Sequence, residues 1–288
     1  MPDRIADLPL RRPVVVGVDG SRNNQAAVRY AVEEAAGTRR PLLLVAVLDD
    51  TGDPSVPQQS PPDWTLLNAI GRRATRQHPD LRVRSTLEFG DVPARLLDRA
   101  RRADRLVIGQ RGLGTFGQPI LGSTSTAVAA RSDRPVLIVP AGWRHEDRRR
   151  HPVVVGIDPT DPDDSAVCFA FEEAARRESA LVAVHAFDTE PRLLWDPVLA
   201  GPAHRTTQTL GARHLEDVVA TFSSVFPSVP VTLCDERSDP ATMLLRRSRA
   251  AQLLVLGRGQ RRTFGPGLGS TSRAVLHYVE IPVAVIPG

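Results

Sequence analysis

The sequence predicts an α/β protein built from two similar domains, each with a doubly wound parallel sheet. Three observations lead to this prediction. The chain has 288 residues, which is long for one compact α/β unit. PVVVGVD at 13–19 recurs as PVVVGID at 152–158, and further matches follow in the same order. Within each copy, short β-branched apolar runs alternate with stretches of helical spacing, the pattern of βαβ units.

The repeat extends over nearly the whole chain. AVRYAVEEAA at 27–36 returns as AVCFAFEEAA at 166–175, at an offset of 139 residues. ARLLDRARRADRLVIG at 94–109 matches TMLLRRSRAAQLLVLG at 242–257 at an offset of 148, so the second copy has gained nine residues in between. The gain falls in a Pro-rich stretch that we expect to be a long surface loop. We therefore expect two homologous domains, at 1–140 and 152–288, joined by a charged linker at 141–151.

In the first copy, buried apolar runs predict the strands and helical spacing predicts the helices. Val14–Val18 is a β-branched run, typical of a parallel strand that is buried on both faces. Asn23 or Asn24 is a candidate cap for the helix that follows. The other expected strands are Leu42–Val47, Leu81–Glu88, Arg105–Gly109 and Val136–Val139, and the other expected helices are Asp63–His78, Val92–Arg102 and Ser123–Arg131.

All 37 basic side chains are arginines, so the chain contains no lysine. This excludes a phosphate loop of the G-x-x-x-x-G-K-[ST] type, a kinase-type strand lysine and Schiff-base chemistry. Any phosphate must be bound by backbone amides, hydroxyls and arginine. The formal net charge is only +4, which makes nucleic acid an unlikely partner.

Two cysteines without metal-ligand spacing, Cys168 and Cys234, indicate a reducing compartment and no disulfide or zinc framework. The first residues carry no apolar segment of the signal-peptide kind, and no apolar stretch approaches 18 residues. We therefore expect a soluble, cytoplasmic protein that has no membrane partner.

Acidic and glycine-rich motifs follow the predicted strands. Asp19 and Asp158 come directly after the first strand of each copy, where a carboxylate either binds a ribose or caps a turn or helix. After the fourth strand, Gly109-Gln-Arg-Gly112 is followed by nine residues and then by Gly122-Ser123-Thr124, which opens a helix. Glycine amides, a helix N-terminus and hydroxyls together predict a phosphate cradle, with ordinary loop and cap chemistry as the alternative. The second copy repeats the motif from Gly257-Arg-Gly259-Gln260 to Gly269-Ser270-Thr271.

These motifs, in this order and twice over, resemble the universal stress protein family, here as a tandem two-domain member. The resemblance implies a Rossmann-like fold in each domain, with a five-stranded sheet of order 3-2-1-4-5. It also implies a site for ATP, alone or with Mg²⁺, in which the aspartate and the end of the second strand hold ribose and adenine while the glycine loop holds the phosphates. Carried over to this sequence, the binding residues are Asp19, Val47, Gly109, Gly112, Gly122, Ser123 and Thr124 in the first domain and Asp158, Ala186, Gly257, Gly269, Ser270 and Thr271 in the second.

The second copy departs from this pattern. Gln260 replaces the glycine found at position 112 of the first copy, and the loop is one residue shorter. Asp161, Asp163 and Asp164 add negative charge that either repels phosphate or, as we favour here, caps and solvates the next helix. We therefore expect tighter nucleotide binding in the first domain.

The leading function is a nucleotide-dependent regulator in the stress response, acting on protein partners that the sequence does not identify. The alternatives are a slow ATPase or self-phosphorylating enzyme and a nucleotide-free interaction module. No catalytic constellation and no metal site stands out, so an enzyme is the less favoured class. The apolar final strands are expected at sheet edges. By the family resemblance they pair across a two-fold axis, as an intrachain pseudo-dimer or as a homodimer.

Overall fold

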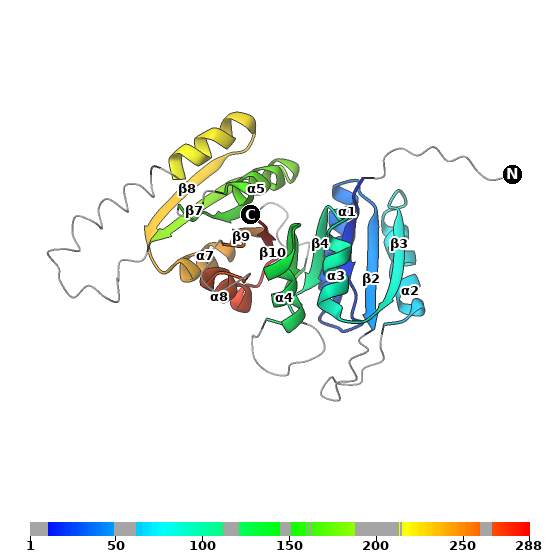
Figure 1. Ribbon diagram of the computed structural model, residues 1–288. Helices are drawn as coiled ribbons and strands as arrows, with labels where there is room; N and C mark the ends of the chain where they lie inside the picture. Colours follow the sequence, from blue (N-terminus) through cyan, green and yellow to red (C-terminus); the bar gives the residue numbers. More distant parts are fainter. Residues whose placement is uncertain are drawn as a thin grey trace.

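A single ten-stranded sheet runs through both copies of the repeat in the computed structural model (Figure 1). Its strand order is β3-β2-β1-β4-β5-β10-β9-β6-β7-β8. Each half thus has the order 3-2-1-4-5 with parallel pairing, as predicted. The structure describes residues 11–48, 62–111, 121–144, 151–159, 161, 163–187, 213, 215–259 and 267–288.

The elements of the first copy agree with the predicted ones to within one or two residues. The third strand departs most, because it begins two residues later and ends one residue later than predicted. The strands are β1 (Val14–Gly17), β2 (Leu42–Leu48), β3 (Val83–Phe89), β4 (Arg105–Gly109) and β5 (Val136–Val139), and the helices are α1 (Gln25–Gly37), α2 (Trp64–Gln77), α3 (Val92–Ala100) and α4 (Ser123–Arg131).

The second copy repeats this order of elements. Its strands are β6 (Val153–Gly156), β7 (Leu181–Phe187), β8 (Val231–Arg237), β9 (Leu253–Gly257) and β10 (Val283–Ile286). Its helices are α5 (Ser165–Arg176), a helix over 215–225, α7 (Pro240–Ser248) and α8 (Ser270–Tyr278). The predicted Pro-rich loop and most of the predicted linker lie outside the described residues.

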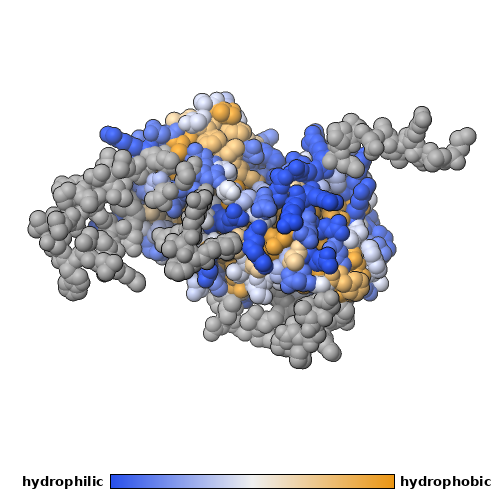
Figure 2. Space-filling view, viewed as in Figure 1, coloured by the Kyte–Doolittle hydropathy of each residue, from blue (hydrophilic) through white to orange (hydrophobic). Residues whose placement is uncertain are grey.

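Helices cover both faces of the sheet. One core contains side chains of α1, α2, α5 and helix 215–225, and the other contains side chains of α3, α4, α7 and α8. The β-branched strands β1 and β6 contribute alternate residues to the two cores, which explains their continuous apolar sequences. Figure 2 shows hydrophobic side chains gathered over helix 215–225, where Val225 is 66% exposed, whereas the face that carries α3 is largely hydrophilic.

The start of α1 differs from a simple asparagine cap. Asn24 precedes the helix, as predicted, but its side chain accepts no hydrogen bond from a helix amide. Its Nδ2 instead donates to the Gly17 carbonyl over 2.9 Å and so ties the helix to the end of β1. Aspartates do cap other helices: Asp63 Oδ1 accepts from the Leu66 amide and Asp91 Oδ2 from the Ala94 amide, both over 2.8 Å.

Removing one of these caps tests how much it contributes to the stability of the protein. Asp91→Ala is expected to lower the free energy of unfolding by about 1 kcal/mol, because an amide in the first turn of α3 loses its acceptor. Urea denaturation measures the change. Asp98→Ala is the matched control, since its exposed ion pair with Arg101 contributes less than about 1 kcal/mol. Equal losses from the two variants would contradict the capping role.

The last strands of the two copies pair with each other. β10 runs antiparallel to β5, with Ala284 opposite Leu137 and Val283 opposite Ile138. Pairing of the final strands within one chain is one of the two arrangements that the family resemblance implied. Each of these strands has neighbours on both sides, so neither lies at an edge of the ten-stranded sheet.

A buried group of charged residues also joins the two copies, and we call it the ion cluster. Glu34 of α1 and Arg105 of β4 come from the first copy, whereas Glu173, Arg176 and Arg177 come from α5 and its C-cap. Arg105 Nη1 lies 2.7 Å from Glu173 Oε1 and also donates to Glu34. Both α5 arginines reach across to Glu34, with donor–acceptor distances of 2.8 Å and 3.1 Å. The two glutamates are 4% and 2% exposed, so these charges depend on one another for compensation.

The ion cluster affects the protonation of Glu173, and burial beside it affects that of Tyr30. Burial opposes the charged form of Glu173, but the three arginines outweigh it and hold the pKa of this carboxyl well below its usual range. Burial raises the pKa of the Tyr30 hydroxyl to about 12, against the opposing effect of Arg177. Tyr30 is therefore neutral at physiological pH, and its hydroxyl accepts from Arg177 Nη2 over 2.9 Å.

The two cysteines of the chain, Cys168 and Cys234, are both free thiols. None of the helices in the described ranges is long and apolar enough to cross a membrane.

Candidate functional site

The predicted site of the first copy lies where β1 pairs with both β2 and β4. From β1 the chain passes to β2 on one side of this strand, and it later returns to β4 on the other side. In open α/β sheets, ligands bind at this reversal of strand order, which is called the topological switch point. Asp19 lies two residues beyond Gly17, which pairs with Val45. Val47 lies two residues further along β2, so the register places it at the level of Asp19. Both side chains are half-buried.

Asp19 belongs to a hydrogen-bonded turn between β1 and α1. Its Oδ1 accepts from the Ser21 amide over 2.8 Å, and Ser21 Oγ accepts from the Asn24 amide over 3.1 Å. The turn role that the sequence left open for this aspartate is therefore present. These bonds fix the carboxylate at the topological switch point of the sheet.

The first glycine loop runs from Gly109 to Gly122, and its two ends are hydrogen-bonded to each other. The Gly122 amide donates to the Gln110 carbonyl over 3.0 Å, and Ser125 Oγ donates to the Gly109 carbonyl over 2.7 Å. A Cβ on Gly109 would lie 3.1 Å from the Arg111 carbonyl oxygen, which is closer than an ordinary contact, so a glycine suits this close approach.

The first turn of α4, directly after Gly122, carries the hydroxyls that we predicted as phosphate donors. Ser123 is exposed and Thr124 is half-buried in the first turn of α4. The first amides of a helix have no partner within the helix, so α4 presents donors and a positive dipole end at this place. Gly112 and the residues up to 120 lie outside the described residues.

The second copy forms a similar but looser arrangement. The Gly269 amide donates to the Arg258 carbonyl and Ser272 Oγ to the Gly257 carbonyl, both over 3.3 Å. Gly259 has a φ of +80°, which glycine adopts readily, whereas Gln260 lies outside the described residues. The remaining predicted residues of this copy are the exposed Asp158 and Ser270 and the half-buried Ala186 and Thr271.

Asp161 does not play the capping role that we favoured for it. Its Oδ1 accepts from the Asp163 amide over 3.1 Å, and its Oδ2 lies 3.9 Å from the place that a Cβ on Gly257 would occupy. Asp163 holds the helix start instead, because its Oδ1 accepts from the Ser165 amide over 2.8 Å. Asp161 thus places a negative charge beside the second glycine loop, whereas the equivalent residue of the first copy is Arg22.

Some of the side chains that shape these sites are not among the residues predicted from the sequence. Ser125 and Ser272 hold the carbonyls at the ends of β4 and β9, and Asn24 holds the end of β1. The two serines were detectable, because both copies carry the same serine three residues after the glycine that precedes the helix. Asn24 carried no such signal, since its equivalent in the second copy is Asp163.

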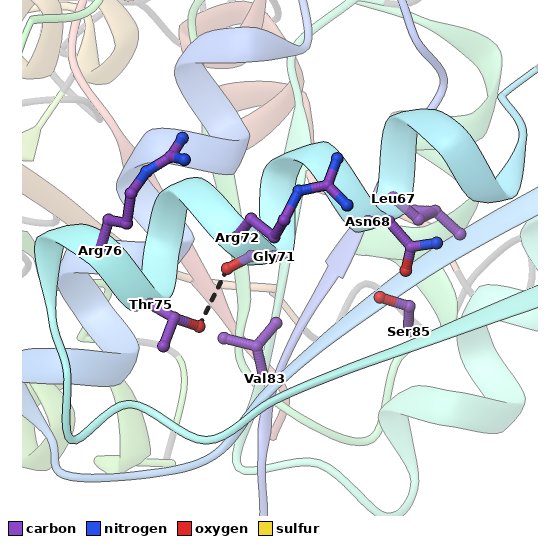
Figure 3. A pocket seen from close by; sticks show the side chains of 8 residues that line it. All are labelled: Leu67, Asn68, Gly71, Arg72, Thr75, Arg76, Val83 and Ser85. Atoms are coloured by element: carbon purple, nitrogen blue, oxygen red, sulfur yellow. Dashed lines mark hydrogen bonds between the residues drawn. The ribbon is translucent and has the colours of Figure 1, made fainter.

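A surface groove of about 510 Å³ lies elsewhere, between α2 and β3 (Figure 3). Gly71 leaves room beside Val83 and Ser85, which lie in the first half of β3. Arg72 and Arg76 extend from α2 away from these two residues, and both are exposed. The groove is therefore at the amino end of its strand, and none of the predicted binding residues lines it.

A sequence profile described as the universal stress protein family matches residues 11–140 and again 149–287. The chain belongs to the universal stress protein family. This universal stress protein is 32% identical to universal stress protein Rv2005c of Mycobacterium tuberculosis, over 94% of the chain and 96% of the relative. It is 31% identical to a universal stress protein of Mycolicibacterium smegmatis, over 95% and 96% respectively.

Solved structures agree with the tandem Rossmann-like fold of this universal stress protein. A universal stress protein from Archaeoglobus fulgidus superposes with a TM-score of 0.63 at 18% identity and covers 96% of each chain. A Pseudomonas aeruginosa protein described as functionally unknown superposes with a TM-score of 0.69 at 15% identity, over 96% of this chain and 92% of its own. At these identities the likeness concerns the fold.

Proposed function

We propose that this universal stress protein binds ATP at the carboxyl ends of β1, β2 and β4 and acts as a nucleotide-dependent regulator. The observation that best supports this proposal is the close approach of Gly109 to the Arg111 carbonyl, next to the N-terminus of α4. A side chain at Gly109 would occupy this space, and the unpaired helix amides suit an anion.

For the ribose, the adenine and the phosphates of ATP, these residues each offer a group that can bind them. The Asp19 carboxylate accepts hydrogen bonds from ribose hydroxyls, and the backbone at Val47 borders the adenine. The amides at Gly109 and Gly112 and the hydroxyls of Ser123 and Thr124 donate to phosphate oxygens. Gly122, whose own amide is bonded to the Gln110 carbonyl, leaves room for the phosphates beside the start of α4. Mg²⁺, where it accompanies ATP, neutralises phosphate charge in a site that has no lysine.

This arrangement suits binding better than rapid phosphoryl transfer. Efficient transfer needs cationic groups that stabilise the charge developing on the phosphoryl oxygens. Without lysine, that task is left to arginines, amides and Mg²⁺. A turnover assay with purified protein distinguishes the alternatives, because multiple turnovers that disappear in Gly122→Val would favour a slow ATPase. Nucleotide released from denatured protein would count against an interaction module that binds none.

The first copy is proposed as the tighter site because the residues beside the two glycine loops differ in charge. Asp161 beside Gly257 repels a polyanion, whereas the residue before α1 that lies beside Gly109 is the neutral Asn24. The equivalent Asp158 and the second glycine motif are proposed as a weaker site for the same ligand.

Removing the two aspartates one at a time tests this ranking. Asp19→Ala is expected to weaken ATP binding about tenfold, because a charged acceptor to the ribose is lost. Asp158→Ala is expected to change total binding less, because the second site is weaker before the substitution. Calorimetric titration with ATP measures both. A larger loss from Asp158→Ala would reverse the ranking, and a wild-type protein without ATP binding would refute the proposed function.

A further inference from the structure

The second copy holds both ends of the first glycine loop. Gln110, which directly follows Gly109, donates from Nε2 to the Leu276 carbonyl of α8 over 2.5 Å. Leu121, which directly precedes Gly122, donates its amide to Nδ1 of His277 over 3.2 Å. Gln110 and Leu121 are 7% and 5% exposed, so both bonds start from buried residues of the first copy.

The first copy in turn contacts the second glycine loop. Arg258 occupies the position of Gln110 in the second copy, and its Nη1 donates to the Ser132 carbonyl over 2.9 Å. Ser132 is the residue that ends α4, just as Leu276 and His277 lie in the last turn of α8. Each helix therefore opens at its own glycine motif and ends against the loop of the other copy.

His277 breaks this approximate symmetry. Its equivalent in the first copy is Ala130, whose methyl group accepts no hydrogen bond. The acceptor for the Leu121 amide is thus a feature of the first loop, which is also the proposed tighter site. Because Leu121 is adjacent to Gly122, its position determines where the first amides of α4 point.

We propose that His277 of the second copy is a positioning residue for the nucleotide site of the first copy. This inference rests on the proposed function, since it assigns to His277 the placement of Leu121 and Gly122 for phosphate binding. The imidazole acts as an acceptor at Nδ1 and holds the loop end in place before any ligand arrives. A site held in this way loses less conformational freedom when the phosphates bind.

Substitutions in the full chain test the role of the acceptor. His277→Leu keeps a bulky side chain but removes the acceptor, whereas His277→Asn keeps an acceptor close to the position of Nδ1. Tyr278→Leu is the matched control, because the neighbouring side chain in α8 is 63% exposed. The probes are hydrogen exchange of the Leu121 amide without ligand and calorimetric titration with ATP fitted for two sites.

We expect His277→Leu to accelerate exchange at Leu121 and to weaken ATP binding at the first site by about two- to tenfold. His277→Asn should restore both properties, Tyr278→Leu should change neither, and the second site should keep its affinity. Unchanged exchange at Leu121 in His277→Leu would overturn the proposal, as would an asparagine variant as impaired as the leucine variant. If the wild-type protein binds no ATP, the proposed function fails, and exchange at Leu121 alone then decides whether His277 positions the loop.

Discussion

Replacing Glu173 with alanine is expected to lower the free energy of unfolding by about 3–5 kcal/mol. Glu173 accepts from Arg105 Nη1 over 2.7 Å and from Arg177 Nε over 2.9 Å, and it also accepts from Arg176. Without it, the buried guanidinium of Arg105 and the half-buried ones of Arg176 and Arg177 share Glu34, and Arg105 keeps a further ion pair with Asp104 over 2.8 Å. The large loss comes from this uncompensated positive charge more than from the bonds themselves.

Thermal and urea denaturation measure the change, and the melting temperature should fall by at least about 6 °C. Glu173→Gln separates charge from packing, because it keeps the shape of the side chain but removes the charge, and it should retain most of the loss. Glu172→Ala is the matched control, since this neighbour on α5 is exposed and lies outside the ion cluster. A Glu173→Ala variant within about 1 kcal/mol of wild type would show that the cluster does not hold the copies together.

The ion cluster also distinguishes the two copies from each other. Arg105 is replaced by the buried Leu253 at the equivalent position of the second copy, and Arg176 corresponds to Gly37 of the first. A Cβ on Gly37 would lie 3.1 Å from Arg176 Nη1, so the small residue of one copy makes room for the large one of the other. When unlike copies meet, Glu34, Glu173 and the neighbouring Asp104 face three arginines, whereas two first copies would lack the α5 arginines. This complementarity favours pairing within the chain.

Most of the fold could be predicted because it depends on short-range patterns that occur twice. β5 is a continuous apolar run and β4 is apolar after Arg105, and the predicted bounds of both agree with the observed ones. The third strand was predicted less well, because Leu81 is apolar and buried yet precedes the strand. Asp161 also escaped prediction, since the sequence does not show which of three nearby aspartates faces the glycine loop.

The contacts between the copies could not be predicted from the sequence. Glu34 and Glu173 occupy equivalent positions in the repeat and look like ordinary surface glutamates of amphipathic helices. Their burial follows from the antiparallel pairing of β5 with β10, which brings α1 and α5 together on one face of the sheet. The same pairing brings His277 to Leu121, which is 156 residues away in the chain.

Gly109→Ala is expected to weaken ATP binding at the first site at least tenfold and to destabilise the protein by about 1–3 kcal/mol. The new methyl group would lie 3.1 Å from the Arg111 carbonyl oxygen, and because this neighbour is backbone, the turn has to give by a few tenths of an ångström. Relief requires the turn after β4 to shift, which moves the Gln110 carbonyl away from the Gly122 amide. The phosphate donors at the start of α4 then lose their placement relative to β4, and small displacements of a binding group are costly.

The equivalent glycine of the second copy provides the matched control. A Cβ on Gly257 would lie 3.9 Å from Asp161 Oδ2 and 4.0 Å from the Gly259 amide nitrogen, which are ordinary contacts. Gly257→Ala should therefore be neutral, or stabilising by up to about 1 kcal/mol because alanine restricts the unfolded chain. Urea denaturation gives the two stabilities, and two-site titration with ATP gives the affinities. Equal effects of the two substitutions would contradict the argument, because the chemical change is the same and only the distance to the backbone differs.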